Sequence, residues 1–169
     1  MHKSSLSSKK LQPLRWKNVQ LQGGFWGERQ RINREITLPM QYEQCKATGR
    51  FDVFKMEWKP GDPGKPHPFW DSDIAKWIEA AGYSLATHPD PVLEQQVDEA
   101  ISWIAGAQQE DGYLNTYYTL VEPEHRFAKL IFSHELYSAG HLIEAAVAYY
   151  QGTGHLPEFY RLYRLGYRQ

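Results

Sequence analysis

The strongest constraint on the fold is an apolar stripe of helical period just after residue 72. Five apolar residues recur at positions i, i+3, i+4, i+7 and i+11, and they are Ile74, Trp77, Ile78, Ala81 and Leu85. This spacing places all five on one face of an α-helix, which must bury that face against a neighbouring element. We expect Asp71 or Ser72 to cap the start of this helix. The chain is therefore predicted to be built from packed helices.

Further helices are expected on both sides of this one. A helix from about residue 28 to 46 contains Pro39, which predicts a kink or two shorter pieces. Another begins after Asp90, a good N-cap residue, with Pro91 at the first helical position, and continues to about residue 108. A fourth runs from Ser133 to about residue 151 and ends at residues 152–154, which contain two glycines. Its apolar residues near one face are Leu136, Gly140, Ile143, Val147 and Tyr150.

The segments between these helices differ in length and composition. We expect residues 1–10 to form a disordered tail and residues 11–26 to form a short strand or an extended arm. Residues 49–68 are rich in proline and glycine and predict a long loop, residues 109–132 an irregular connector, and Pro157 the start of a further helix. Long helices joined alternately by short and long connectors are typical of stacked helical hairpins, so the predicted fold class is all-α.

Charge and cysteine content exclude several classes of function. The formal net charge of −1 provides no basic field for a phosphate backbone, so we expect no nucleic-acid partner. No stretch approaches the roughly 20 apolar residues of a membrane helix, and residues 1–10 lack the apolar run of a secretory signal. We therefore expect a cytoplasmic protein without a membrane partner. The lone cysteine, Cys45, excludes an internal disulfide, and a small buried residue is favoured over a nucleophile.

Polar and aromatic residues gather at the predicted helix starts. Asp71 and Asp73 either stabilise the helix start or hold the hydroxyls of a ligand at a pocket rim. His134 begins the fourth helix and is interpreted as a pocket residue, whereas His141 is interpreted as a hydrogen-bonded core residue. Their seven-residue separation is too long for both to bind one metal ion. In the connector, Asp111 and Gly112 predict a turn anchored by a tyrosine, and an alternative is that Tyr113, Tyr117 and Tyr118 line a sugar site.

Four segments in this order resemble the N-terminal part of glycoside hydrolase family 127, the β-L-arabinofuranosidases, formerly grouped as a domain of unknown function. They are Trp70-Asp71-Ser72-Asp73-Ile74-Ala75-Lys76-Trp77-Ile78-Glu79, His88-Pro89-Asp90-Pro91, residues 108–114 and residues 133–148. The resemblance spans roughly residues 21 to 160. It implies an (α/α)6 toroid, of which this chain supplies about half of the helices, so residues 11–169 are expected to be the truncated N-terminal part of a catalytic domain. A complete toroid needs on the order of 350 residues.

The resemblance also implies a chemistry. Members hydrolyse terminal β-L-arabinofuranosyl residues with retention, using a cysteine nucleophile, a glutamate acid/base and a zinc ion held by cysteines and a glutamate. Those residues lie downstream of the matched part, and Cys45 matches none of them, so we expect no catalytic residue, metal ligand or cofactor within this chain. The residue that matches a sugar-contacting position is His134. Trp70, Asp71 and Asp73 match the pattern before the helix and complete the expected substrate-binding set.

Three functional hypotheses follow. The first is the N-terminal fragment of a β-L-arabinofuranosidase that acts on a small oligosaccharide or glycoside and is inactive alone. The second is a non-catalytic or vestigial carbohydrate-binding helical fragment. The third is an enzyme similar to unsaturated glucuronyl hydrolases, in which Asp71 or Asp73 would be the acid. Because an incomplete toroid leaves apolar helix faces uncovered, we also expect the isolated chain to be poorly soluble, molten or a homo-oligomer.

Overall fold

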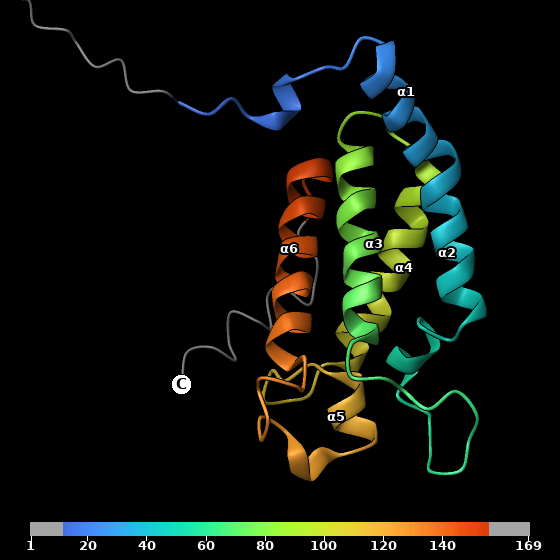
Figure 1. Cartoon of the computed structure of the whole chain (residues 1–169), viewed down its shortest axis with the longest axis vertical. Coiled ribbons are helices and arrows are strands. Elements are labelled where there is room, and N and C mark those ends of the chain that lie inside the picture. Colours follow the sequence, from blue (N-terminus) through green and yellow to red (C-terminus); the bar gives the residue numbers. More distant parts are fainter. Residues whose placement is uncertain (1–11, 156–169) are drawn as a thin grey trace, which may run out of the picture.

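The computed structural model describes residues 12–155 of the chain, and within this range every regular element is a helix. Figure 1 shows the central pair, α3 (Trp70–Leu85) and α6 (Glu135–Thr153), running side by side in the same direction. Helices α2 (Leu38–Ala47) and α4 (Pro91–Ala107) run in the opposite direction beside α3. The predicted all-α class is confirmed, and so is the arrangement of antiparallel helices joined into hairpins.

The first long helix is continuous from residue 24 to 47 but changes its winding ahead of Pro39. It consists of α1 (Gly24–Ile32), the π-helical η2 (Asn33–Thr37) and α2. A proline lacks an N–H group and its ring clashes with the carbonyl four residues earlier, here that of Glu35. The wider π turn contains that carbonyl. Within it the Leu38 N–H donates to the carbonyl of Asn33, five residues earlier, where an α-helix would use the residue four earlier. The predicted interruption is therefore a π turn.

Residues 12–22 form the expected arm. The arm contains the 3-10 turn η1 (Trp16–Asn18) and no strand, and α1 begins at Gly24, inside the range expected to be extended. The Trp16 indole N–H donates to Gln151 at 3.1 Å, and its ring meets the edge of Tyr83 at 5.0 Å. These contacts fasten the arm to the ends of α3 and α6. The predicted disordered tail and the helix expected near Pro157 lie outside the described residues.

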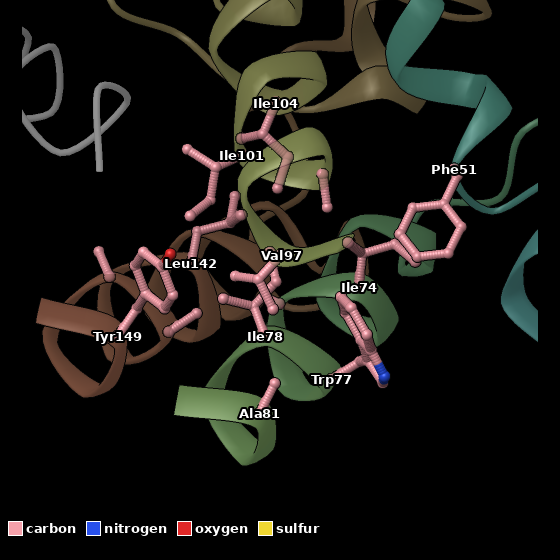
Figure 2. Packing of buried hydrophobic residues seen from close by; sticks show 14 of the residues in the cluster. Phe51, Ile74, Trp77, Ile78, Ala81, Val97, Ile101, Ile104, Leu142 and Tyr149 are labelled. Atoms are coloured by element: carbon pink, nitrogen blue, oxygen red, sulfur yellow. The ribbon is translucent and has the colours of Figure 1, made fainter. Parts of the chain in front are cut away.

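Helix α3 buries the predicted stripe, but its start differs from the expectation. All five residues of the stripe are 6% exposed or less, and Figure 2 shows Ile74, Trp77, Ile78 and Ala81 among the neighbouring helices. The helix begins at Trp70 after Phe69, without a side-chain cap, so the predicted capping by Asp71 or Ser72 is wrong. The carboxylate of Asp71 instead accepts hydrogen bonds from Thr116, and the Ser72 hydroxyl donates to the Phe69 carbonyl at 2.8 Å.

Helix α4 starts as predicted. Asp90 accepts hydrogen bonds from the N–H groups of Val92 and Leu93 at 3.0 and 3.2 Å, and Pro91 occupies the first helical position. The connector after α4, predicted to be irregular, contains the short helix α5 (Thr116–Leu120) and the 3-10 turn η4 (Pro123–His125). Asn115 caps α5 by accepting from the N–H of Tyr118 at 3.0 Å. This five-residue helix is too short for an apolar period to reveal it.

Small residues allow α3 and α6 to approach closely. A Cβ atom added to Gly82 would lie 2.9 Å from the backbone nitrogen of Tyr149, and one added to Gly152 would lie 2.3 Å from the Gly82 carbonyl oxygen. The buried face of α6 consists largely of alanines, together with Leu142 and Tyr149. The apolar residues expected on one face lie on the exposed side, where Leu136, Ile143, Val147 and Tyr150 are 37–51% exposed.

The loop predicted at residues 49–68 contributes to the core. Its 3-10 turn η3 (Asp52–Lys55) buries Phe51, Val53 and Phe54, each at 5% exposed or less. Phe51 packs against Trp77 of α3 and Trp103 of α4 at ring distances of 5.8 and 5.6 Å. Figure 2 places the Phe51 ring at the edge of the cluster beside Trp77. The remainder of the loop, residues 56–69, has no regular structure.

Candidate functional site: a polar cleft beside the start of α3

A polar cleft of about 550 Å³ lies between α2 and α3. Amide, ammonium, guanidinium and carboxylate groups line it, and they belong to Asn33, Gln41, Gln44, Arg50, Asp73 and Lys76. Such a mixture of hydrogen-bond donors and acceptors is suited to a polyhydroxylated ligand. A larger hollow of about 760 Å³ lies next to the loop around residues 46–64, but it contains none of the predicted site residues.

Asp73 and Trp70 meet through Arg50. The Arg50 Nε donates to the Asp73 carboxylate at 2.8 Å, and a second guanidinium nitrogen donates to the Thr48 hydroxyl at 2.6 Å. The same guanidinium lies over the Trp70 ring, 5.2 Å from its centre. Arg50 is therefore fixed by an ion pair, a hydrogen bond and a cation–π contact. This ion pair holds Asp73 at the cleft. The Asp73 carboxylate and the Arg50 guanidinium are both partly exposed, so a ligand can reach them.

Asp71 points away from this cleft and into the protein. It is 1% exposed, and its two carboxylate oxygens accept from the Thr116 N–H at 2.8 Å and the Thr116 hydroxyl at 2.6 Å. Burial raises the pKa of this carboxyl to about 6, against the lowering effect of the two hydrogen bonds. In this geometry Asp71 ties α3 to the start of α5 and has no free oxygen for a ligand.

His134 lies at the start of α6 in a left-handed conformation, with φ of 55°. Its Nδ1 lies 3.0 Å from the Phe132 carbonyl oxygen, and its ring lies 5.8 Å from both Phe69 and Tyr137. A carbonyl oxygen only accepts, so Nδ1 carries the proton and Nε2 of the neutral ring is an acceptor. Non-glycine residues are uncommon in this backbone region and concentrate at functional sites.

Lys76 and Tyr137 connect His134 to the cleft. The Lys76 ammonium lines the cleft and lies 4.9 Å from the centre of the Tyr137 ring, which also contacts His134. Phe69, which precedes α3, also contacts the His134 ring. Both α3 and α6 begin at the end of the molecule that carries α5 (Figure 1). The structure thus brings Trp70, Asp73 and His134 to one end of the helix pair and separates Asp71 from them.

The described residues offer one group with metal-ligand geometry. Ligand atoms of Glu79, His141 and Glu144 lie within 4.8 Å of one another, and His141 faces Glu144 at 3.1 Å. Cys45 is not part of this group, and burial raises the pKa of its thiol, which disfavours the thiolate. Within residues 12–155 the donor set therefore does not fit a cysteine-ligated zinc ion. His141 is partly exposed, so its predicted core position is only partly correct.

Sequence reasoning missed most of the residues that line the cleft. Arg50 and the amides of α2 lie 20 or more positions before Trp70 and carry no local signal. The three tyrosines proposed for a sugar site do not form one surface. Tyr113 and Tyr118 are buried at 8% exposed, whereas Tyr117 is partly exposed. The predicted turn is present, since Asp111 accepts from the Tyr113 N–H at 2.9 Å, and the buried Tyr113 side chain anchors it by donating its hydroxyl to Glu135.

Comparison with known proteins places this geometry in a family. Residues 18–159 match the family model described as β-L-arabinofuranosidase, GH127 catalytic domain. The chain belongs to glycoside hydrolase family 127. Over 90 residues it is 51% identical to a non-reducing end β-L-arabinofuranosidase of Bifidobacterium longum subsp. longum, a match that covers 51% of this chain and 14% of that protein. The resemblance read from the motifs around Trp70 and His134 is confirmed.

Two solved family 127 structures have the same fold over most of the chain. A GH127 β-L-arabinofuranosidase from Geobacillus stearothermophilus T6 matches with a TM-score of 0.80 and 40% identity, covering 88% of this chain and 25% of that one. The GH127 β-arabinofuranosidase BT3674 matches with a TM-score of 0.79 and 36% identity, covering 89% and 25%. This family 127 chain thus spans about a quarter of the length of each. It is part of an (α/α)6-type fold, and no described helix has the length and apolarity needed to cross a bilayer.

Proposed function

We propose that this chain forms one wall of the glycoside-binding pocket of a β-L-arabinofuranosidase that releases arabinofuranosyl residues from the non-reducing end. The observation that carries the proposal is the polar cleft at Asp73, found in a chain that matches the family 127 catalytic domain over residues 18–159. Sugar hydroxyls both donate and accept hydrogen bonds, so they suit the Asp73 carboxylate and the neighbouring amides. The apolar face of a sugar suits an aromatic ring such as the partly exposed Trp70.

In this proposal the described residues bind substrate and do not perform the chemistry. Asp73 and His134 accept hydrogen bonds from hydroxyl groups, and Trp70 and Arg50 form the rigid base beneath them. The nucleophilic cysteine, the acid/base glutamate and the zinc ligands of the complete enzyme are expected downstream of the part matched here. The chain alone is therefore proposed to be inactive, and a cytoplasmic location stays a prediction. The family match does not favour the unsaturated glucuronyl hydrolase alternative.

Calorimetric titration of the 169-residue chain with methyl β-L-arabinofuranoside tests the proposal. We expect weak, saturable binding that Asp73→Asn reduces, because an amide replaces a charged acceptor and Arg50 loses its partner. Asp52→Asn is the matched control, since Asp52 also forms an ion pair, with Lys55 at 2.7 Å, but lies outside the cleft. Equal losses in the two variants, or no binding to the unmodified chain, would contradict the proposal. Turnover of an unsaturated uronide would favour the alternative enzyme.

A further inference from the structure

The first turn of α6 contains a buried carboxylate that the binding site does not use. Glu135 is 2% exposed and accepts a hydrogen bond from the Tyr113 hydroxyl. Both of its oxygens also lie 3.0 Å from the backbone nitrogen of Phe127, which donates to them. Within residues 12–155 this carboxylate forms no ion pair. A charge buried in this way is tolerated only when hydrogen bonds satisfy it, so the three segments that meet at Glu135 are strongly coupled.

The partners of Glu135 are themselves fixed. The Tyr113 N–H donates to Asp111 at 2.9 Å, and Arg126 donates to the same carboxylate at 2.7 Å. The Arg126 guanidinium lies 3.5 Å from the centre of the Tyr113 ring, and the Phe127 ring meets that ring at 5.2 Å. The network therefore joins the turn at Asp111, the segment around Phe127 and the start of α6 into one unit.

The loop between residues 127 and 134 has a strained backbone at both ends. Phe127 has φ of 58° and His134 has φ of 55°, and such left-handed conformations cost a non-glycine residue about 1 kcal/mol or more. Glu135 binds the N–H of Phe127 directly and follows His134 in the chain. Within the loop, the His134 ring is oriented by the Phe132 carbonyl at 3.0 Å. Glu135 is thus the point at which both strained ends of the loop are held.

We propose that Glu135 is a positioning residue that holds the 127–134 loop so that His134 presents its Nε2 to a ligand hydroxyl. Only the nature of the ligand rests on the proposed function; the positioning is a property of this chain. Loss of one hydrogen bond of the network would release the loop. Because such a bond contributes about 1 kcal/mol, the ordered form of the loop would fall about fivefold relative to open forms.

The test compares two buried tyrosines, Tyr113 in the connector before α5 and Tyr149 in α6. Tyr113→Phe removes the hydroxyl that donates to Glu135, and Tyr149→Phe removes an equivalent hydroxyl that donates to Asp98 at 2.5 Å. Both rings are buried, at 8% and 1% exposed, and each variant loses a single oxygen atom. Exchange of the imidazole C2 hydrogen, followed by mass spectrometry in the full chain, reports on each histidine separately. The other histidines, His88 and His125 among them, are internal references.

We expect Tyr113→Phe and Glu135→Gln to change the exchange rate of His134 by about fivefold, while Tyr149→Phe leaves it unchanged despite a similar loss of thermal stability. Circular dichroism confirms that helix content is retained, and Glu135→Gln provides the second route if Tyr113→Phe unfolds. Unchanged exchange at His134 in both variants would overturn the proposal, as would an equal change in Tyr149→Phe. If His134 responds but no arabinofuranoside binds, the positioning stands and the proposed function fails.

Discussion

At the scale of single residues, Asp71 predicts a pH dependence of stability. Burial raises its pKa to about 6, from an ordinary value of 3.8. Below pH ~4 the carboxyl is protonated in both the folded and the unfolded state. As the pH rises from ~4 to ~6, the unfolded state releases this proton while the folded state retains it, so the free energy of unfolding falls. Above pH ~6 both states are ionised and the effect is constant.

The variant Asp71→Asn removes this titration. We expect its free energy of unfolding, relative to the unmodified chain, to increase by about 3 kcal/mol between pH ~4 and pH ~7. The variant also loses part of the hydrogen bonding to Thr116, which shifts both ends of the comparison equally. Urea denaturation at several pH values measures the difference. A difference independent of pH would show that Asp71 titrates normally in the folded protein.

At His134 we expect the backbone to favour glycine while binding needs the imidazole ring. Its left-handed conformation suits glycine, whereas alanine retains the clash of its Cβ atom with the backbone. We therefore expect His134→Gly to be more stable than His134→Ala by about 1 kcal/mol, although both lose the ring that faces Phe69 and Tyr137. Thermal denaturation of the two variants tests this, and calorimetry should show that neither binds an arabinofuranoside normally. Equal stabilities would mean that His134 leaves the left-handed region in solution.

At the scale of helices, the contact between α3 and α6 depends on Gly82. A Cβ atom there would lie 2.9 Å from the Tyr149 nitrogen and 3.0 Å from the Ala148 carbonyl carbon, and these backbone atoms can move only with the whole helix. We expect Gly82→Ala to destabilise the fold by about 1–3 kcal/mol through this overlap.

Gly140 of α6 provides the control for Gly82. A Cβ atom at Gly140 meets no atom within 4 Å. Alanine has the better helix propensity, so Gly140→Ala should stabilise the fold by about 0.5–1 kcal/mol. Thermal denaturation of both variants gives the two shifts. Stabilisation by Gly82→Ala would contradict the observed closeness of α3 and α6.

The same helix pair shows how far sequence reasoning extends. Helix α3 contains no proline and has a wide apolar stripe, whose period alone predicted the buried face. In α6 the buried face consists largely of alanines, with Leu142 and Tyr149, because α3 approaches closely at Gly82 and Gly152, whereas Ile143 and Val147 lie on the exposed side. Hydrophobicity by itself selects the larger side chains and therefore the wrong face.

Contacts between distant segments determine where several site residues lie, and local sequence patterns could not predict these positions. Asp71 reads as a helix-start residue, yet its partner Thr116 lies 45 positions away. Arg50 lies in a segment that reads as loop, and its pairing with Asp73 depends on how that segment returns to α3. The family resemblance pointed to His134 and Trp70 as expected site residues, whereas the cleft between α2 and α3 depends on the packing of the helices.

At the scale of the whole molecule, the exposed face of α6 predicts self-association. Leu136, Ile143, Val147 and Tyr150 are 37–51% exposed along one helix, and contiguous apolar surface of this kind promotes association. We expect the double substitution Ile143→Lys and Val147→Glu to shift the isolated chain toward a monomer, because charged groups on that face remain solvated. Sedimentation velocity measures the distribution. A chain that is already monomeric without the substitutions would refute the predicted association.

In the function that we propose, the cleft beside Asp73 and the neighbouring His134 form the glycoside-binding wall of a family 127 enzyme. The most direct test of this proposal is a hydrogen–deuterium exchange footprint of the 169-residue chain with and without saturating methyl β-L-arabinofuranoside. We expect the ligand to slow amide exchange around Gln41, Arg50, Asp73 and His134 and to leave the C-terminal half of α4 unchanged. Protection confined to the larger hollow around residues 46–64 without Asp73 or His134, or no protection anywhere, would contradict it.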